Sequence, residues 1–148
     1  MNFSELLGRR LKDDEIIEVL EDRQIDVVYG FDKSHENMDD IYWASAKTDG
    51  FLFRFDKDQV LNTIFLYVEP SEGFNAISRS EIDVRIFQTY DAAEEYFKAN
   101  RVLYNVSSGR PGTEKYKWWI KADCDSYYCH YEFKDGKIFR ITLIKKSA

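Results

Sequence analysis

Two histidines, His35 and His130, are the side chains of this sequence that titrate near neutral pH without help from their surroundings. A pair of this kind can supply the acid and the base of a ribonuclease-like reaction. His35 stands in the polar segment DKSHENMDD, where we expect a solvated loop, and His130 stands in YYCHYEF, where we expect a sheet face. A small two-histidine enzyme is therefore an alternative hypothesis, and we predict no catalytic residue.

Two cysteines and a histidine stand close together near the end of the chain, where acidic neighbours could join them in a metal site. Cys124, Cys129 and His130 are accompanied by Asp123 and Asp125, but the two cysteines lie two residues further apart than in a usual zinc knuckle. Cys129 and His130 are also neighbours in a predicted strand, so their side chains point to opposite faces. We therefore expect no metal and no other cofactor, with Cys129 in the core and Cys124 in a turn.

Paired carboxylates offer a third kind of chemistry. Asp39 with Asp40, and Glu69 with Glu72, could bind Mg²⁺ or act as the acids of a glycosidase. The chain has 27 acidic residues in 148, so many of them must lie near one another on any surface. We therefore interpret these pairs as surface carboxylates.

Aromatic residues make up 16% of the chain and could stack nucleic-acid bases on a sheet face. The candidates for such a face are Tyr116, Trp118, Tyr127, Tyr128 and Tyr131. The chain as a whole has 21 basic residues against 27 acidic ones and a net charge of -6, whereas nucleic-acid binding draws most of its affinity from a basic face. An RNA-binding or ligand-binding aromatic sheet is therefore a second alternative, and we predict no direct nucleic-acid partner.

The elements that must position these side chains follow from the apolar spacing along the chain. Helix periodicity covers 1–24, with Gly8 separating a short first turn from the main helix, and reappears over 89–101. Asp13 or Asp14 is expected to cap the first main helix, and Thr89 or Asp91 the second. The segment 82–87 is a short strand or an extended connector. The segments predicted to be extended or strand are 25–31, 41–46, 51–55, 60–69, 102–106, 116–122, 127–133 and 138–146.

The two halves of the chain repeat the order helix, extended segment, loop and three strands. A shift of 77 residues places Asp14 on Asp91 and Leu61 on Ile138. We predict one domain over 1–148, with pseudo-repeats over about 1–76 and 77–148 that arose by tandem duplication of a helix plus three-strand unit. The predicted fold class is α+β: an antiparallel sheet of about six to eight strands with two helices on one face.

Composition also limits the class of protein. The sequence has no apolar run of the roughly 18 residues that span a bilayer, and its start, MNFSELLGRRLKDDE, has no apolar core of a secretory signal. We therefore expect a cytoplasmic protein without a membrane partner. Acidic loops together with abundant Tyr and Trp favour protein binding, since negative charge steers cationic partners and large aromatic side chains anchor interfaces.

Three segments carry a further pattern: LLGRRLKDDEIIEVLE, then FRFDKDQVLNTIFLYVE followed by GF, and finally YEFKDGKIFRITLI. They resemble the immunity proteins that bacteria encode beside polymorphic toxins of the contact-dependent and type VI secretion kinds. The residues that match the pattern of that group are Leu6, Leu7, Gly8, Asp13–Glu18, Phe55, Asp56, Asp58, Val60, Ile64, Phe65, Leu66 and Tyr67.

The resemblance implies a protein that is not an enzyme. Such a protein binds a cognate toxin domain in the cytoplasm and blocks its active site, and the toxin is commonly a nuclease with a basic substrate cleft. An acidic inhibitor would then pair its carboxylates with the toxin's cationic side chains.

Residues for partner binding follow from the acidic loops together with this resemblance. Asp123, Asp125 and Tyr127 are included by analogy with the matching loop of the first half. The aromatic side chains expected in the core are Tyr42, Trp43, Trp118 and Trp119. The predicted partner-binding residues are Asp32, Glu36, Asp39, Asp40, Glu69, Glu72, Asp123, Asp125 and Tyr127.

Overall fold

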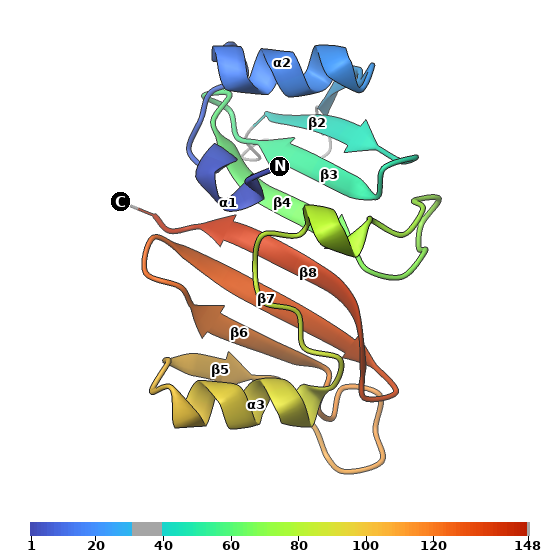
Figure 1. Ribbon diagram of the computed structural model, residues 1–148, viewed down its shortest axis with the longest axis vertical. Helices are drawn as coiled ribbons and strands as arrows, with labels where there is room; N and C mark the ends of the chain where they lie inside the picture. The colour runs from blue at the N-terminus through green and yellow to red at the C-terminus, as the bar shows by residue number, and fades with distance from the viewer. Residues whose placement is uncertain (31–39, 148) are drawn as a thin grey trace.

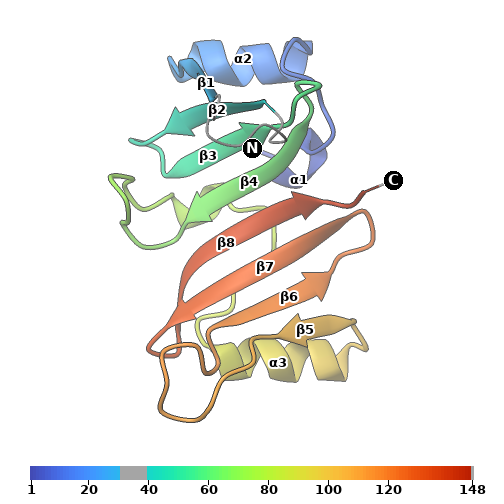
Figure 2. The same ribbon diagram turned by 180° about the vertical axis from the view of Figure 1, so that it is seen from behind.

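One antiparallel sheet of eight strands organises the molecule, in the order β1-β2-β3-β4-β8-β7-β6-β5. The computed structural model describes residues 1–30 and 40–147 (Figure 1). The helices lie in front of the sheet in Figure 1 and behind it in Figure 2, so they cover one face and leave the other uncovered. The predicted α+β class, the size of the sheet and the placement of the helices are confirmed.

The predicted elements appear with modest changes at their ends. Within the described residues, no helix is long and apolar enough to cross a membrane. The helices are α1 (Phe3–Leu6), α2 (Asp14–Asp22), α3 (Tyr90–Ala99) and the 3-10 helix Arg79–Glu81. The strands are β1 (Val27–Gly30), β2 (Ile41–Ala46), β3 (Phe51–Phe55), β4 (Leu61–Tyr67), β5 (Tyr104–Val106), β6 (Trp119–Asp123), β7 (Tyr127–Lys134) and β8 (Lys137–Lys145).

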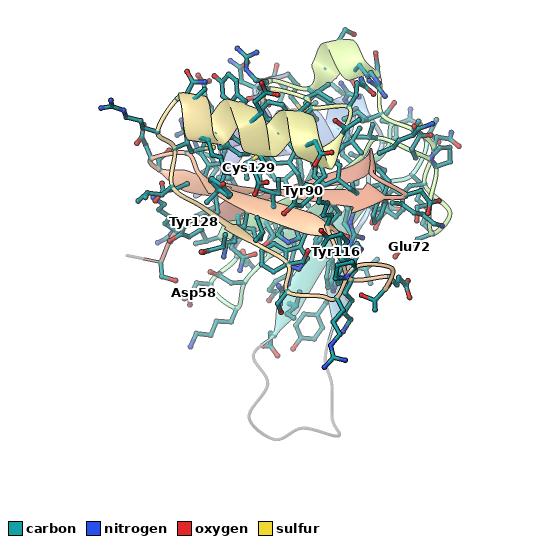
Figure 3. All side chains as sticks on the ribbon, turned by 90° about the horizontal axis from the view of Figure 1, so that it is seen from below. Asp58, Glu72, Tyr90, Tyr116, Tyr128 and Cys129 are labelled. Atoms are coloured by element: carbon teal, nitrogen blue, oxygen red, sulfur yellow. The ribbon has the colours of Figure 1, made fainter. Side chains whose placement is uncertain are left out.

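The core lies between the helices and the covered face of the sheet. Alternate residues of β3 show why: Phe51, Phe53 and Phe55 are fully buried, and the residues between them are only half-buried. Phe3 of α1 packs its ring edge-on against Phe51, with 5.2 Å between the ring centroids. Figure 3 shows α3 lying along the same face in the second half, with Cys129 beneath it. Period-two alternation therefore defines one apolar face, as it does in half-covered antiparallel sheets.

The first predicted helix is two short helices with a hydrogen-bonded connection between them. Gly8 has a φ of +88°, and its N–H donates to the Leu61 carbonyl at 2.9 Å. The Leu61 N–H in turn donates to the Arg9 carbonyl at 2.8 Å, so the chain leaves α1 by pairing with the start of β4. The connector 82–87 forms no strand.

Helix capping follows the prediction at one helix only. Thr89 is the N-cap of α3, and its hydroxyl accepts a hydrogen bond from the Ala92 N–H at 3.2 Å. Asp13 is the N-cap residue of α2, but its side chain makes no capping hydrogen bond. The Asp13 carboxylate instead accepts from the Arg10 N–H at 2.8 Å, because the connection before α2 turns back on itself.

Each half of the sheet is built in the same way around the central β4–β8 pair. A helix is followed by four strands in each half, and the segment before the helix bridges to the start of the last strand (Arg10 with Val60, and Thr89 with Lys137). The third strand of each half has a register shift at the same place, between Arg54 and Phe55 in β3 and between Glu132 and Phe133 in β7. The repeating unit therefore has one strand more than predicted, because the extended segments 25–31 and 102–106 supply the edge strands. Descent from a duplication stays a prediction.

Candidate functional site

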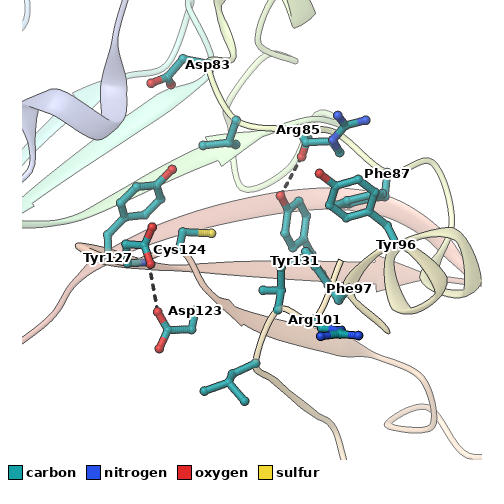
Figure 4. A pocket seen from close by; sticks show the side chains of 14 residues that line it. Asp83, Arg85, Phe87, Tyr96, Phe97, Arg101, Asp123, Cys124, Tyr127 and Tyr131 are labelled. Carbon is teal, nitrogen blue, oxygen red and sulfur yellow. Dashed lines mark hydrogen bonds between the residues drawn. The ribbon is translucent and has the colours of Figure 1, made fainter. Parts of the chain in front are cut away.

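A cleft of about 620 Å³ opens on the covered side of the second half (Figure 4). Three pieces of chain form its walls: the connector from Asp83 to Phe87, the turn after α3 at 101–103, and the turn between β6 and β7. These pieces meet because β7 runs beneath both the connector and α3.

The turn between β6 and β7 carries three of the predicted partner-binding residues into this cleft. Asp123, Asp125 and Tyr127 all line it. The Asp123 carboxylate accepts a hydrogen bond from Lys146 Nζ at 2.5 Å and another from the Asp125 N–H at 3.0 Å. The hydrogen bond from Lys146 keeps the pKa of Asp123 below its usual value. Asp125 has a φ of +66° and makes no ion pair among the described residues, which leaves its carboxylate available to a partner.

The floor of the cleft is an aromatic cluster. The Tyr131 hydroxyl donates to the Arg85 carbonyl at 2.7 Å, and this bond holds the connector against β7. Phe87 packs against Tyr131 and Phe97 with ring centroids 5.3 and 5.2 Å apart. Burial raises the pKa of Tyr131 far above its usual value, so this hydroxyl is a hydrogen-bond donor and not a proton source.

One wall of the cleft joins the two halves of the molecule. The Ser4 hydroxyl of α1 donates to the Asp83 carboxylate at 2.7 Å, and the Ser4 N–H donates to the same oxygen at 3.1 Å. Tyr127 lies beside this pair, and burial raises the pKa of its hydroxyl to about 12. The position of this wall therefore depends on contacts between α1 and the connector.

The two thiols lie side by side at the cleft, on the face predicted for Cys129. Cys129 is fully buried, and burial raises the pKa of its thiol well above the usual value. Cys124 lines the cleft, and hydrogen bonding to Cys129 lowers the pKa of its thiol. His130 lies on the opposite face of the sheet, as strand geometry predicts. No group of three or more His, Cys, Asp and Glu side chains with the geometry of a metal site occurs among residues 1–30 and 40–147.

The other predicted partner-binding residues lie elsewhere. Asp40 stands before β2, where it accepts a hydrogen bond from the Tyr29 hydroxyl of β1, and this bond raises the pKa of Tyr29. Glu72 accepts from the Tyr67 hydroxyl at 3.4 Å. Glu69 and Glu72 follow the last residue of β4. Because the pairs β4–β8, β8–β7 and β7–β6 are all antiparallel, the end of β4 lies at the opposite end of the sheet from Asp123 at the end of β6. Asp32, Glu36 and Asp39, together with His35, lie outside the described residues.

The uncovered face of the sheet bears aromatic side chains that already have partners. Trp43 has the Arg54 guanidinium 5.6 Å from its ring centroid, and Trp119 packs against His130 with ring centroids 5.2 Å apart. Tyr128 has Lys121 Nζ 4.4 Å from its ring centroid. We expected Trp43, Trp118 and Trp119 in the core, but all three are only half-buried. For Trp43 and Trp119 the reason is that their side chains lie on this uncovered face. Tyr127 and Tyr131 lie on the covered face and cannot serve a base-stacking surface here.

A buried ion pair on the uncovered face is the main feature that the sequence interpretation missed. Arg140 donates to both oxygens of the Glu132 carboxylate at 2.8 to 3.1 Å, and Glu132 is only 6% exposed. A regular hairpin closed at Lys134 and Lys137 would pair Glu132 with Phe139. The register shift beside Glu132 moves the pairing to Arg140, and a shift of this kind has no simple sequence signature.

Comparisons of the chain with protein family models, with curated proteins and with solved structures find no match. The geometry of the cleft is therefore the basis for a function. Its rim combines the carboxylates of Asp123 and Asp125 with the exposed apolar side chain of Leu103. An arrangement of this kind suits the recognition of another molecule.

Proposed function

We propose that this protein is an immunity protein that binds a cognate bacterial toxin domain and neutralises it by covering its active site. The single observation that carries the proposal is that Asp123, Asp125 and Tyr127, predicted as partner-binding residues, all line the same cleft. The cleft also has an apolar anchor at its rim, because Leu103 lines it and is 77% exposed. An exposed leucine beside acidic groups provides the apolar centre and charged rim of a protein interface.

The charges of the cleft favour a cationic partner. Three carboxylates, of Asp83, Asp123 and Asp125, line the cleft against the two guanidinium groups of Arg85 and Arg101. The guanidinium of Arg85 stacks over the ring of Tyr96 at 4.4 Å and so is directed to its own aromatic neighbour. A lysine or arginine of the partner would therefore find the exposed carboxylate of Asp125 as its acceptor, and the interface would shield the resulting charge-assisted hydrogen bond from water.

The overall charge agrees with a nuclease as the toxin. At a net charge of -6, the protein attracts a protein with a basic substrate cleft over long range and so accelerates the encounter at low salt. The bound inhibitor would occupy the space of the nucleic-acid backbone. This part of the proposal depends on the resemblance to immunity proteins, and the cleft supports it through its carboxylates.

The test is co-expression with the toxin domain encoded by the adjacent upstream gene. We expect the wild-type protein to restore growth and to co-purify with the toxin. Each of the single variants Leu103→Ser and Asp125→Asn should weaken the complex by about tenfold or more. The first variant removes the apolar anchor, and the second removes the free carboxylate. Asn is tolerated at a positive φ, so this substitution does not strain the turn.

The matched control is Glu95→Gln on the exposed side of α3, which removes one acidic charge outside the cleft. This variant should bind and protect like the wild type. The proposal is wrong if the wild-type protein neither binds nor protects, or if Glu95→Gln weakens the complex as much as Asp125→Asn does. Protection that persists when both His35 and His130 are replaced would exclude the alternative two-histidine enzyme.

A further inference from the structure

The edge strand β5 has backbone groups that point away from the sheet. On one side of the strand, the Leu103 carbonyl accepts a hydrogen bond from β6 at 2.9 Å, and at the other end the Ser107 N–H donates one to β6 at 3.0 Å. Because the bonding side alternates along an antiparallel strand, the N–H and C=O groups of Tyr104 and Val106 point outward. Strand β5 ends the sheet order, and no residue in 1–30 or 40–147 pairs with these outward groups.

The neighbouring parts of the chain do not close this edge. The segments on both sides of β5 are described, and the loop after it packs on its own backbone: a Cβ on Gly109 would lie 2.8 Å from the Lys115 carbonyl carbon. The undescribed segment 31–39 joins β1 to β2, and five strands lie between β2 and β5. At ordinary spacing β2 and β5 are about 29 Å apart, whereas a segment of this length that returns to β2 reaches at most about 18 Å.

A positively charged hollow of about 350 Å³ opens beside β5 on the uncovered face. The Nζ of Lys121 lies 4.4 Å from the ring centroid of Tyr128, and Lys121 makes no ion pair within the described part of the chain. The carboxylate of Asp123 is already engaged by Lys146. The hollow therefore offers an uncompensated cation to an acidic side chain. Its lining residues are Leu103, Tyr104, Asn105, Lys121, Asp123 and Tyr128.

The covered side of the same strand is apolar. Val106 is 39% exposed, and β5 contains no charged residue and no proline, which are common protections of an edge strand. Helix α3 packs over the face of the sheet, because the Phe97 ring lies 6.0 Å from the ring centroids of both Tyr104 and Tyr131. In Figure 2, which views the uncovered face, β5 forms the lower edge of the sheet.

We propose that β5 is a docking edge for an extended segment of a partner protein in which acidic and apolar side chains alternate. The backbone of the segment would pair with the outward groups of Tyr104 and Val106 and add a ninth strand to the sheet. Alternate side chains of a strand point to opposite faces, so the acids would meet Lys121 and the apolar side chains would cover Val106. A second copy of this chain is a poor occupant, because its own edge, 101–110, contains no Asp or Glu.

This edge requires the opposite charge from the cleft. The cleft offers the carboxylate of Asp125 to a cation, whereas the hollow offers Lys121 to an acid, although Leu103 lines both. Asp125→Asn therefore tests the cleft alone, and Lys121→Gln tests the edge alone. The two proposals can fail independently of each other.

The experiment uses the full chain and a defined probe, the peptide Val-Glu-Val-Glu-Val-Glu-Val, titrated by NMR. The peptide is acidic and the protein has a net charge of -6, so overall attraction cannot produce the binding. Binding should be weak, because the short strand offers few hydrogen bonds. It should shift the amide signals of β5 and protect the Tyr104 and Val106 amides from hydrogen exchange.

Two variants test the two parts of the site. Val106→Pro removes an outward N–H without breaking a bond to β6, and it should weaken binding by about fivefold or more. Val106→Ala keeps that N–H and should weaken binding less. Lys121→Gln should weaken binding by about threefold, whereas Lys47→Gln, which removes an exposed cation from the first half, should bind like the wild type. Far-ultraviolet circular dichroism checks that each variant is folded.

Several results would overturn the proposal. These are the absence of binding at millimolar peptide, equal binding by folded Val106→Pro, and equal losses with Lys47→Gln and Lys121→Gln. Binding of a peptide whose backbone is N-methylated would also contradict strand pairing. Asp125→Asn should bind the peptide like the wild type, and a loss there would assign the peptide to the cleft instead. A concentration-dependent dimer abolished by Val106→Pro would overturn the proposal in favour of a second copy.

Discussion

At the scale of single residues, the pair formed by Glu132 and Arg140 is the most consequential interaction of the sheet. Burial alone would raise the pKa of Glu132, but hydrogen bonds from His130 and Arg140 outweigh burial and hold the pKa below its usual value. The same carboxylate raises the pKa of Arg140 against the opposing effect of burial. Removing one partner of such a pair leaves a charge buried without compensation, which costs much more than the pair itself contributes.

This pair predicts a pH-dependent stability. The lowered pKa of Glu132 contributes stability that is fully present above the ordinary value of 4.5 and is lost as the pH falls through the lowered folded-state pKa. Glu132→Gln should therefore unfold more easily than the wild type at pH 7, by about 2 to 3 kcal/mol, and the difference should shrink in acid. Urea unfolding at several pH values measures it, with Glu95→Gln as the control. A difference that stays constant with pH would contradict this assignment.

At the scale of elements, the turn between β2 and β3 depends on a glycine. Gly50 has a φ of +83°, and a Cβ at this position would lie 2.5 Å from the Ile77 nitrogen and 2.6 Å from the Asn75 carbonyl oxygen. The backbone approaches so closely because the Gly50 carbonyl accepts from the Tyr67 N–H at 2.9 Å, and the Tyr67 carbonyl accepts from the Ile77 N–H at 2.8 Å. Two connections are thus packed backbone against backbone.

Gly50→Ala should therefore destabilise the protein by about 3 kcal/mol or more, since backbone atoms must move in addition to the strain of a positive φ. Gly73→Ala is the matched control: Gly73 has a φ of +86°, but no atom lies within 4 Å of an added Cβ. Its cost should be about 1 kcal/mol, from backbone strain alone. Denaturant midpoints of the two variants measure the difference, and equal midpoints would show that the close approach is not important.

At the scale of the whole molecule, the two halves share one sheet and one core. Strands β4 and β8 pair from Thr63 with Ile144 to Tyr67 with Arg140. Without this pairing, each half would have an unpaired strand at its inner edge. Ser4 of the first half also holds Asp83 of the second. Folding either half alone would expose the apolar residues that meet at this pair, including Leu66 and Ile141.

We therefore predict one cooperative unfolding transition for residues 1–148. The three tryptophans allow a direct test, because Trp43 belongs to the first half and Trp118 and Trp119 to the second. In the variant Trp43→Phe, the remaining tryptophan fluorescence reports unfolding of the second half only. In the double variant Trp118→Phe, Trp119→Phe, it reports unfolding of the first half only. Within each variant, the fluorescence midpoint should coincide with the midpoint from far-ultraviolet circular dichroism. Separate midpoints would indicate two domains.

Local pattern was sufficient to determine the elements of this fold. The alternation of Phe51, Phe53 and Phe55 defines a half-buried strand, and Asp-Gly after Lys134 defines a hairpin, because side-chain direction and turn geometry depend on neighbouring residues. The shift of 77 residues likewise indicated two similarly ordered halves. The α+β class and the helices on one face follow from these local features together.

Tertiary structure alone decided which side chains meet. The predicted acidic residues that the structure describes fall at three separate places, because strand order and direction, not distance along the chain, place the start of β2 and the ends of β4 and β6. The register shift beside Glu132 created the ion pair with Arg140, and the passage of the connector over Tyr131 created the cleft beside Asp125. These contacts join residues far apart in the sequence or out of regular register. They depend on packing across the whole sheet, which local periodicity does not encode.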